Sequence, residues 1–180
     1  MGGNKTGSRC VKSVNPMQKR TMREQLVQLG NGAHALAIQI LGNADDAADA
    51  VQDAYHSVLK RPDAYDASKG PLKPWFLRVV RNRCIDLVRR RRPSGSEADE
   101  LPTADAGPEQ RVETAQRDRA LHVALAALPP EQRQILVLRD GMDLSYADIA
   151  DVLDVAAGTV MSRLHRARQA LRRQLIEQGE

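Results

Sequence analysis

Cysteines, aromatic residues and long apolar runs are all scarce in this chain. Cys10 and Cys84 stand 74 positions apart, which gives neither a metal-ligand spacing nor a disulfide framework. No run of about 18 apolar residues occurs, so we expect no membrane insertion. The N-terminus is basic but lacks the apolar core of a signal peptide. The sequence therefore predicts a cytoplasmic protein.

Residue sets typical of catalysis are also missing. We find no nucleophile and base pair, and no glycine loop of the kind that cradles phosphate. Asp45, Asp46, Asp49 and Asp53 could together hold Mg²⁺ for a nuclease, but no His, Glu or further ligand forms a recognisable partner set. Helix capping and a protein-binding surface explain these aspartates with fewer assumptions than a metal site does. We expect no enzyme, no catalytic residue, no metal and no cofactor.

The apolar residues recur at spacings of three and four, and no segment alternates with period two. The pattern predicts an all-α fold with two small helical domains, of which the C-terminal one contains a helix-turn-helix. A flexible acidic linker over residues 93–110 joins them, because this stretch holds five acids and no Lys or Arg. The expected divisions are a disordered leader over 1–20, a first domain over 21–92 and a second over 111–180.

At most four helices are expected before the linker, and the sequence delimits three of them. The first runs from about Met22 to Leu41, although two glycines weaken it. The second runs over 44–60, and Asn43 can cap it. A loop over 61–71, rich in Pro, Asp, Ser and Gly, leads to the third helix, which begins near Pro74.

This third helix carries an unusual concentration of positive charge. Seven arginines stand against the single Asp86 between Arg78 and Arg92. Like charges on one side of a helix repel each other, so their repetition indicates a polyanionic partner that neutralises them. Cys84 falls on the apolar face, where a small buried thiol is its expected role. Trp75 is more typical of a core residue than of a base-stacking platform.

The stretch from Leu144 to Arg173 has the pattern of a helix-turn-helix. Ser145 can cap its first helix, with Asp148 in the capping-box position. The second helix has an apolar stripe and an opposite polar side, which carries Ser162, His165, Arg166, Gln169 and Arg173. Five arginines and no acid lie between Arg163 and Arg173. Both a solvated charged face and a DNA-reading face remain open for this segment alone.

The order of motifs resembles a known family. ADDAADAVQDAY is followed by a proline-bearing loop and KPWFLRVVRNRCIDLVRRRR. After the acidic linker comes ALPPEQRQILVLRDGMDLSYADIADVLDVAAGTVMSRLHRARQAL. This arrangement resembles an extracytoplasmic-function (ECF) sigma factor, the smallest group related to the bacterial housekeeping sigma, over about residues 22–175. The resemblance implies two domains, sigma regions 2 and 4, that bind core RNA polymerase and promoter DNA.

The resemblance also assigns roles to residues. Core polymerase would bind the face of Asp49, Gln52 and Asp53. The −10 element would be bound by a loop that holds a flipped base and by the helix after it, through Arg61, Asp63, Tyr65, Lys69, Lys73, Arg78, Arg81, Asn82 and Arg89. The −35 element would be read by Thr159, Ser162, Arg163, His165, Arg166 and Arg173.

The sequence departs from the family pattern in places. Met161 and His165 occupy variable positions of the recognition helix, so no base preference can be carried over. Only five aromatic residues occur in the chain, which implies weak stacking during strand opening and a need for a well-matched promoter.

Three functions remain to be compared. The first is an alternative sigma factor that directs core polymerase to promoters and that an anti-sigma protein holds in check. The second is a stand-alone helix-turn-helix regulator, and the third is a sigma mimic that sequesters an anti-sigma protein. The aspartate-bearing face favours the first function over the second. The retained arginines favour it over the third, because a mimic has no need of them.

Overall fold

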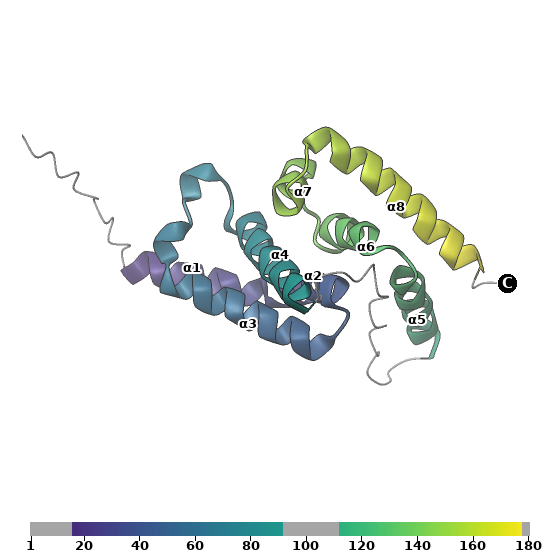
Figure 1. The fold of residues 1–180 in the computed structure, drawn as a ribbon, viewed down its shortest axis with the longest axis horizontal. Helices are drawn as coiled ribbons and strands as arrows, with labels where there is room; N and C mark the ends of the chain where they lie inside the picture. The colour runs from purple at the N-terminus through teal and green to yellow at the C-terminus, as the bar shows by residue number, and fades with distance from the viewer. Residues whose placement is uncertain (1–15, 92–111, 178–180) are drawn as a thin grey trace, which may run out of the picture.

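The computed structural model describes residues 16–91 and 112–177, which are built from helices and connecting turns without a strand (Figure 1). The N-terminal group contains α1 (Pro16–Gln28), α2 (Gly30–Leu41), α3 (Ala44–Lys60), the short 3₁₀ turns η1 (Pro62–Ala64) and η2 (Ala67–Lys69), and α4 (Leu72–Arg91). The C-terminal group contains α5 (Val112–Ala126), α6 (Pro130–Leu136), the π-helical turn η3 (Val137–Gly141), α7 (Tyr146–Leu153) and α8 (Ala157–Glu177). The predicted all-α fold with a C-terminal helix-turn-helix is confirmed.

The start of the chain differs from the sequence-based prediction. Helix α1 begins at Pro16, so residues 16–20 of the expected disordered leader are helical, and residues 1–15 lie outside the described part. Proline suits a first helical position, because its missing N–H would have no helical partner there. The predicted acidic linker over 93–110 also lies outside the described residues.

The single helix expected from Met22 to Leu41 is divided at Leu29. The cause is a side chain from α3: the Tyr55 hydroxyl donates a 2.8 Å hydrogen bond to the carbonyl of Leu26 at the end of α1. A Cβ atom at Gly30 would lie 3.2 Å from that same hydroxyl oxygen. Glycine thus lets Tyr55 approach the junction closely enough to bond the last turn of α1.

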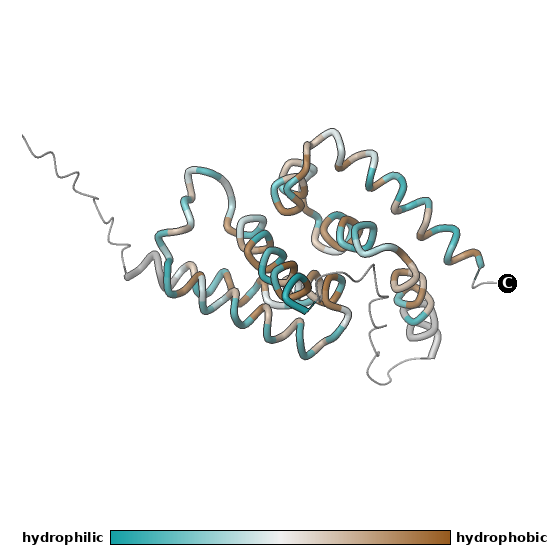
Figure 2. The backbone as a smooth tube through the Cα atoms, in the orientation of Figure 1, coloured by the Kyte–Doolittle hydropathy of each residue, from teal (hydrophilic) through white to brown (hydrophobic). Residues whose placement is uncertain are grey.

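The core of the N-terminal group lies between α2, α3 and α4, whose apolar sides face one another (Figure 2). Leu36 and Phe76 are fully buried there, and the ring of Phe76 lies 4.9 Å from that of Tyr55. Cys84 is buried on the same face of α4, as predicted, and burial raises the pKa of its thiol to about 12. The thiol therefore stays protonated and acts as a small apolar group.

The predicted caps are formed. The Asn43 side chain accepts hydrogen bonds from the backbone N–H groups of Asp45 and Asp46, at 2.9 and 3.0 Å. In α7 the Ser145 hydroxyl accepts from the Asp148 N–H at 3.1 Å and donates to the Asp148 carboxylate at 2.7 Å. The Asp148 side chain thus binds the capping hydroxyl, whereas a longer Glu in a capping box reaches back to the cap's N–H.

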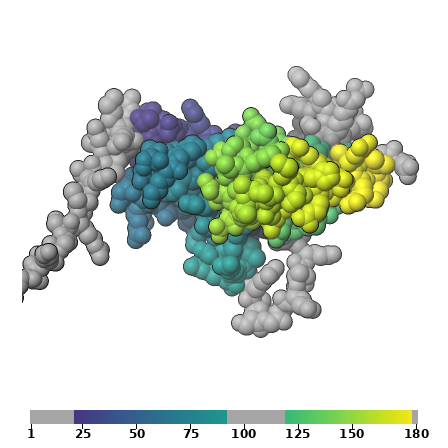
Figure 3. All heavy atoms as spheres, turned by 90° about the horizontal axis from the view of Figure 1, so that it is seen from above, coloured from purple at the N-terminus to yellow at the C-terminus, as the bar shows by residue number. Residues whose placement is uncertain are grey.

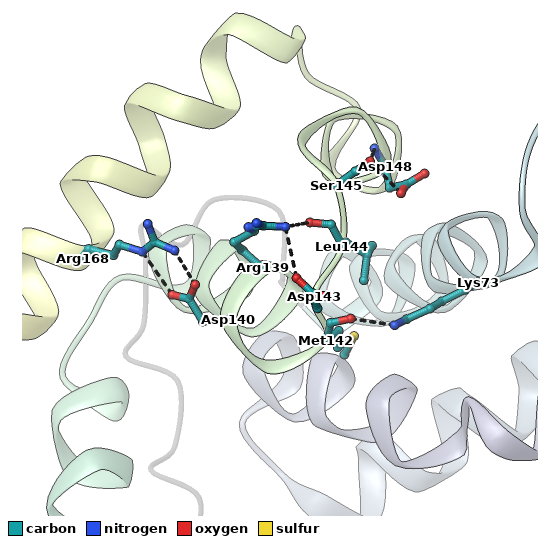
Figure 4. Close-up of polar contacts among 9 residues, drawn as sticks. All are labelled: Lys73, Arg139, Asp140, Met142, Asp143, Leu144, Ser145, Asp148 and Arg168. Carbon is teal, nitrogen blue, oxygen red and sulfur yellow. Dashed lines mark hydrogen bonds and ion pairs between the residues drawn. The ribbon is translucent and has the colours of Figure 1, made fainter.

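The two groups of helices pack directly against each other (Figure 3). Helix α4 contacts α7, and α2 contacts α6 and η3. The Lys73 ammonium donates a 2.6 Å hydrogen bond to the carbonyl of Met142 across this boundary (Figure 4). The buried apolar residues of both groups accordingly form one continuous cluster.

Replacing Asn43 by Ala is expected to lower the free energy of unfolding by about 1 kcal/mol, because two N–H groups at the start of α3 lose their side-chain acceptor. Urea unfolding followed by circular dichroism measures this change. Asn31→Ala is the matched control, because Asn31 is exposed inside α2 and caps nothing. Equal destabilisation by the two substitutions would contradict the capping role.

Candidate nucleic-acid interface and polymerase-binding face

Helix α8 is held as the second helix of the helix-turn-helix by an apolar seam. Val160, Leu164 and Ala167 are buried against α6 and α7. The turn before it is made by Asp154, whose φ of 55° lies in the left-handed region that Asp tolerates better than most residues. This geometry fixes which side of α8 reaches solvent.

The exposed side of α8 carries most of the predicted −35 residues. Ser162, His165, Arg166 and Arg173 are all exposed along it. The Ser162 hydroxyl donates to the carbonyl of Thr159 at 3.0 Å, and the Arg166 Nε donates to that of Ser162 at 3.3 Å. Arg166 is thus ordered along the helix and free of any acid in the described structure, which suits it to bond a base edge or a phosphate.

Two other predicted readers lie off this face. Arg163 is half-buried and forms an ion pair with Glu131 of α6 at 3.6 Å. Thr159 is also half-buried. The structure thus places Arg163 against its own domain, and its reading of bases stays a prediction.

Sequence reasoning missed two arginine contacts that hold the helix-turn-helix together. Arg168 bonds the carboxylate of Asp140 in η3, with its Nε 3.3 Å from one carboxylate oxygen (Figure 4). In the same turn, Arg139 donates to the carbonyl of Leu144 at 2.6 Å. Met161 is 62% exposed on α8 beside the predicted readers. The sequence had already placed Met161 in the recognition helix, whereas the two arginine contacts depend on how separate segments meet.

The loop between α3 and α4 is ordered by its own polar side chains. Asp66 accepts from the N–H and the hydroxyl of Ser68, at 3.0 and 2.7 Å. The Tyr65 hydroxyl donates to the carbonyl of Gly70 at 3.0 Å, and the Tyr65 ring lies 5.2 Å from that of Trp75. The loop therefore presents a pair of aromatic rings at the start of α4.

A cavity of about 410 Å³ opens beside these rings. Tyr65, Lys69, Trp75 and Arg78 contribute to its lining from the N-terminal group, and Asp148 and Asp151 contribute from α7. Trp75 is only half-buried, so its expected role as a core residue is incomplete. In the sequence, the place of Trp75 next to the loop and directly before Phe76 already indicated that Trp75 lies at the end of α4 that borders the loop.

The other predicted −10 residues differ in how exposed they are and in where they lie. Arg78, Asn82 and Arg89 are exposed and share one face of α4, because they are spaced by four and seven residues. Lys73 and Arg81 are half-buried where the C-terminal group covers α4. The two remaining loop residues, Arg61 and Asp63, are exposed away from the cavity lining.

Arg81 has an unusual environment for a surface arginine. Its Nε is buried without a hydrogen-bond partner. Burial lowers the pKa of Arg81, while Asp154 and Glu131 of the C-terminal group raise it and Arg163 lowers it. A guanidinium remains charged in such a site, so these carboxylates compensate part of its desolvation.

The predicted polymerase-binding residues lie on α3. Asp49 and Gln52 are exposed on the side of α3 that faces away from the core. Asp53 is also exposed in part, but its carboxylate forms an ion pair with Arg83 of α4. Arg91 pairs in the same way with Asp46, and this bond lowers the pKa of Asp46. Asp49 and Gln52 thus lie exposed on the same side of α3. Asp53 instead links α3 to α4 through its ion pair with Arg83.

Across 16–91 and 112–177, no cluster of three or more His, Cys, Asp or Glu side chains could hold a metal ion. None of the helices described over these ranges is long and apolar enough to cross a bilayer.

Comparison with known proteins places this geometry in a family. Residues 26–94 match Sigma-70 region 2, and residues 118–171 match Sigma-70, region 4. The chain is 37% identical to the ECF RNA polymerase sigma factor SigE of Mycolicibacterium smegmatis over 93% of its own length and 66% of that protein. It is 40% identical to the ECF RNA polymerase sigma factor SigM of Mycobacterium tuberculosis, over 79% of this chain and 70% of that one.

A solved structure shows the same fold. The chain superposes on the sigma factor RpoE of Bartonella quintana, solved in complex with the anti-sigma factor NepR, with a TM-score of 0.73 and 26% identity. This match covers 87% of this chain and 97% of RpoE. Both regions and nearly the whole described chain thus agree, and the chain belongs to the ECF sigma factors, alternative sigma factors that direct promoter-specific transcription initiation.

Proposed function

We propose that this sigma factor binds core RNA polymerase through α3 and grips one promoter at two places, through α4 with its preceding loop and through α8. Region 2 would span residues 21–92 and region 4 residues 111–180, joined by the linker over 93–110. The chain would act in the cytoplasm as a binding subunit with no catalytic step of its own. The cavity beside Tyr65 and Trp75 is the observation that carries this proposal.

The cavity has the chemistry that a single-stranded −10 element requires. Aromatic rings stack with bases whatever their sequence, and cations beside them hold the backbone phosphates. Tyr65 and Trp75 supply the rings, and Lys69 and Arg78 supply the cations. A stand-alone regulator that reads only duplex DNA has no use for such a site, whereas a sigma factor must capture a base that leaves the duplex.

Helix α8 supports the second grip. A recognition helix lies in the major groove, where its N-terminal residues contact the base edges. Ser162, His165 and Arg166 occupy that part of α8 and are exposed, and Arg173 continues the cationic face along the helix. We assign the first three to base edges and Arg173 to a phosphate.

The α3 face supports binding to the polymerase. Asp49 and Gln52 are exposed on α3 and have no hydrogen-bonding or ionic partner from another helix in the described structure. A protein partner of opposite charge would bind there without competing for DNA. The NepR complex of RpoE further supports an anti-sigma protein as a second partner of this chain.

Run-off transcription tests the proposal as a whole. Core RNA polymerase supplied with this chain should produce defined transcripts from a pool of bacterial promoter fragments, and neither component alone should do so. A stand-alone regulator or a mimic would produce none.

The double substitution Asp49→Lys/Gln52→Lys should abolish these transcripts and pull-down of core polymerase, because it reverses the charge of the exposed α3 face. Glu177→Lys is the charge-reversal control at the far end of α8 and should leave pull-down unchanged. Retained core binding by the double variant would exclude the α3 face.

The two DNA surfaces should respond differently to loss of an arginine. Arg166→Ala should cost about 1–3 kcal/mol of discrimination at one −35 position, measured by sequencing transcripts from a promoter library randomised there. Arg89→Ala should weaken binding to all sequences and reduce its salt dependence, because a phosphate contact carries no base information. Arg163→Ala is the matched comparison, since Arg163 already pairs with Glu131. Relaxed base choice in Arg163→Ala but not in Arg166→Ala would reverse the assignment of readers.

A further inference from the structure

Met161 is an apolar side chain on the helix that is expected to meet duplex DNA. It is 62% exposed, and it lies outside the apolar cluster that the described residues of the chain form. Removing apolar surface from water is favourable, so an exposed methionine gains free energy when a partner covers it. Its place on the recognition helix indicates what that partner is.

The position of Met161 along α8 suits contact with bases. It lies four residues after Ala157, the first residue of the helix, in the part of a recognition helix that contacts base edges. Residues four apart are neighbours on one side of a helix, so Met161 adjoins the exposed His165. Long helical side chains point back over the preceding turn, which here holds Gly158. A Cβ atom at Gly158 would meet nothing within 4 Å, so this end of the helix leaves room for a base.

The charges on α8 separate Met161 from the arginines that are free to bind DNA. Arg168 lies two turns after Met161 on the same side of the helix, and Asp140 of η3 neutralises it. Arg166 and Arg173 share another side of the helix, because they are seven residues apart, and both stay exposed. The N-terminal half of α8 therefore offers a cation on one side of its exposed face and an apolar side chain on the other.

Thymine is the base that offers an apolar group in the major groove. All base edges there present hydrogen-bond donors or acceptors, and thymine adds a C5-methyl group. A methionine side chain is flexible and apolar, so it adapts to the shape of such a group. Its thioether sulfur is only a weak acceptor, which gives it little to exchange with the polar edges of the other bases.

We propose that Met161 selects thymine at one position of the −35 element by covering its C5-methyl group, an inference that rests on the proposed function because it requires α8 in the major groove. Met161 is then a specificity-determining residue of a different kind from Arg166, which acts through hydrogen bonds. Covering one methyl group changes affinity by about fourfold. The preference for thymine should be of that size.

A double-mutant cycle between protein and DNA tests the contact. In a promoter that run-off transcription identifies, each thymine of the −35 element is replaced singly by deoxyuridine, which lacks only the methyl group. Holoenzyme made from core polymerase and the full chain should bind one of these duplexes about fourfold more weakly than the thymine duplex, measured by fluorescence anisotropy. The penalty should vanish in Met161→Gln, which keeps the length and helical preference of the side chain but makes its end polar. It should remain in Met161→Leu, which stays apolar.

Promoter selection gives a second readout that needs no modified base. Transcripts from a library randomised over the −35 element should show a preference for thymine, on one strand, at the position where deoxyuridine weakens binding. Met161→Gln should lose this preference, and Met161→Leu should keep it.

Ile176→Gln is the matched control, because Ile176 is also an apolar residue of α8, 56% exposed, but lies next to the C-terminal end of the helix. It should retain the full penalty for deoxyuridine. A penalty that is equal in the wild type and in Met161→Gln would assign the effect to the shape of the DNA and would overturn the proposal. Absence of a thymine preference at every −35 position would overturn it as well.

Failure of the proposed function gives a different result. If no promoter fragment is transcribed with core polymerase, α8 has no −35 element to read, and both the function and the role of Met161 are wrong. If transcripts form and deoxyuridine changes binding at no position, the function holds and Met161 reads no methyl group.

Discussion

The packing of α4 against α2 and α3 determines which of its many arginines can meet a partner. Phe76, Val80 and Cys84 are fully buried, so the remaining positions of the helix have fixed directions. Arg83 and Arg91 point toward α3, where Asp53 and Asp46 neutralise them. Such exposed ion pairs add little stability, but they remove two cations from the free surface. Arg78, Asn82, Arg89 and Arg90 stay exposed to solvent, and the first three of them share one face of α4.

Local sequence patterns predicted the elements well. Asn43 and Ser145 cap the helices for which they were expected, and the apolar spacing of Val160, Leu164 and Ala167 identified the buried side of α8. These features depend on residues within one or two turns of each other. The resemblance to sigma factors, carried by motifs in both halves, supplied the order of the domains and the family.

The break in the first helix, the position of Arg163 and the cavity beside Trp75 were not predicted, because each depends on contacts between residues far apart in the sequence. The break at Leu29 follows from a hydrogen bond between Tyr55 and Leu26, which are 29 residues apart. Arg163 pairs with Glu131 of α6, although the resemblance to the family had placed Arg163 among the predicted readers. Trp75 lines a cavity only because α7, more than 70 residues later in the chain, lies opposite it. No spacing rule contains this information, since it arises when the two groups of helices meet.

Where the two groups of helices meet, α7 contacts both α8 and α4. As the first helix of the helix-turn-helix, α7 supports α8 through Ile149 and Val152, which are fully buried. Through its exposed carboxylates it also borders the cavity on α4. Asp154, directly after α7, and Glu131 of α6 also raise the pKa of the half-buried Arg81, so carboxylates of the C-terminal group compensate part of the desolvation of this α4 cation. The position of one short helix therefore decides both which side of α8 is buried and which side chains border the cavity beside Trp75.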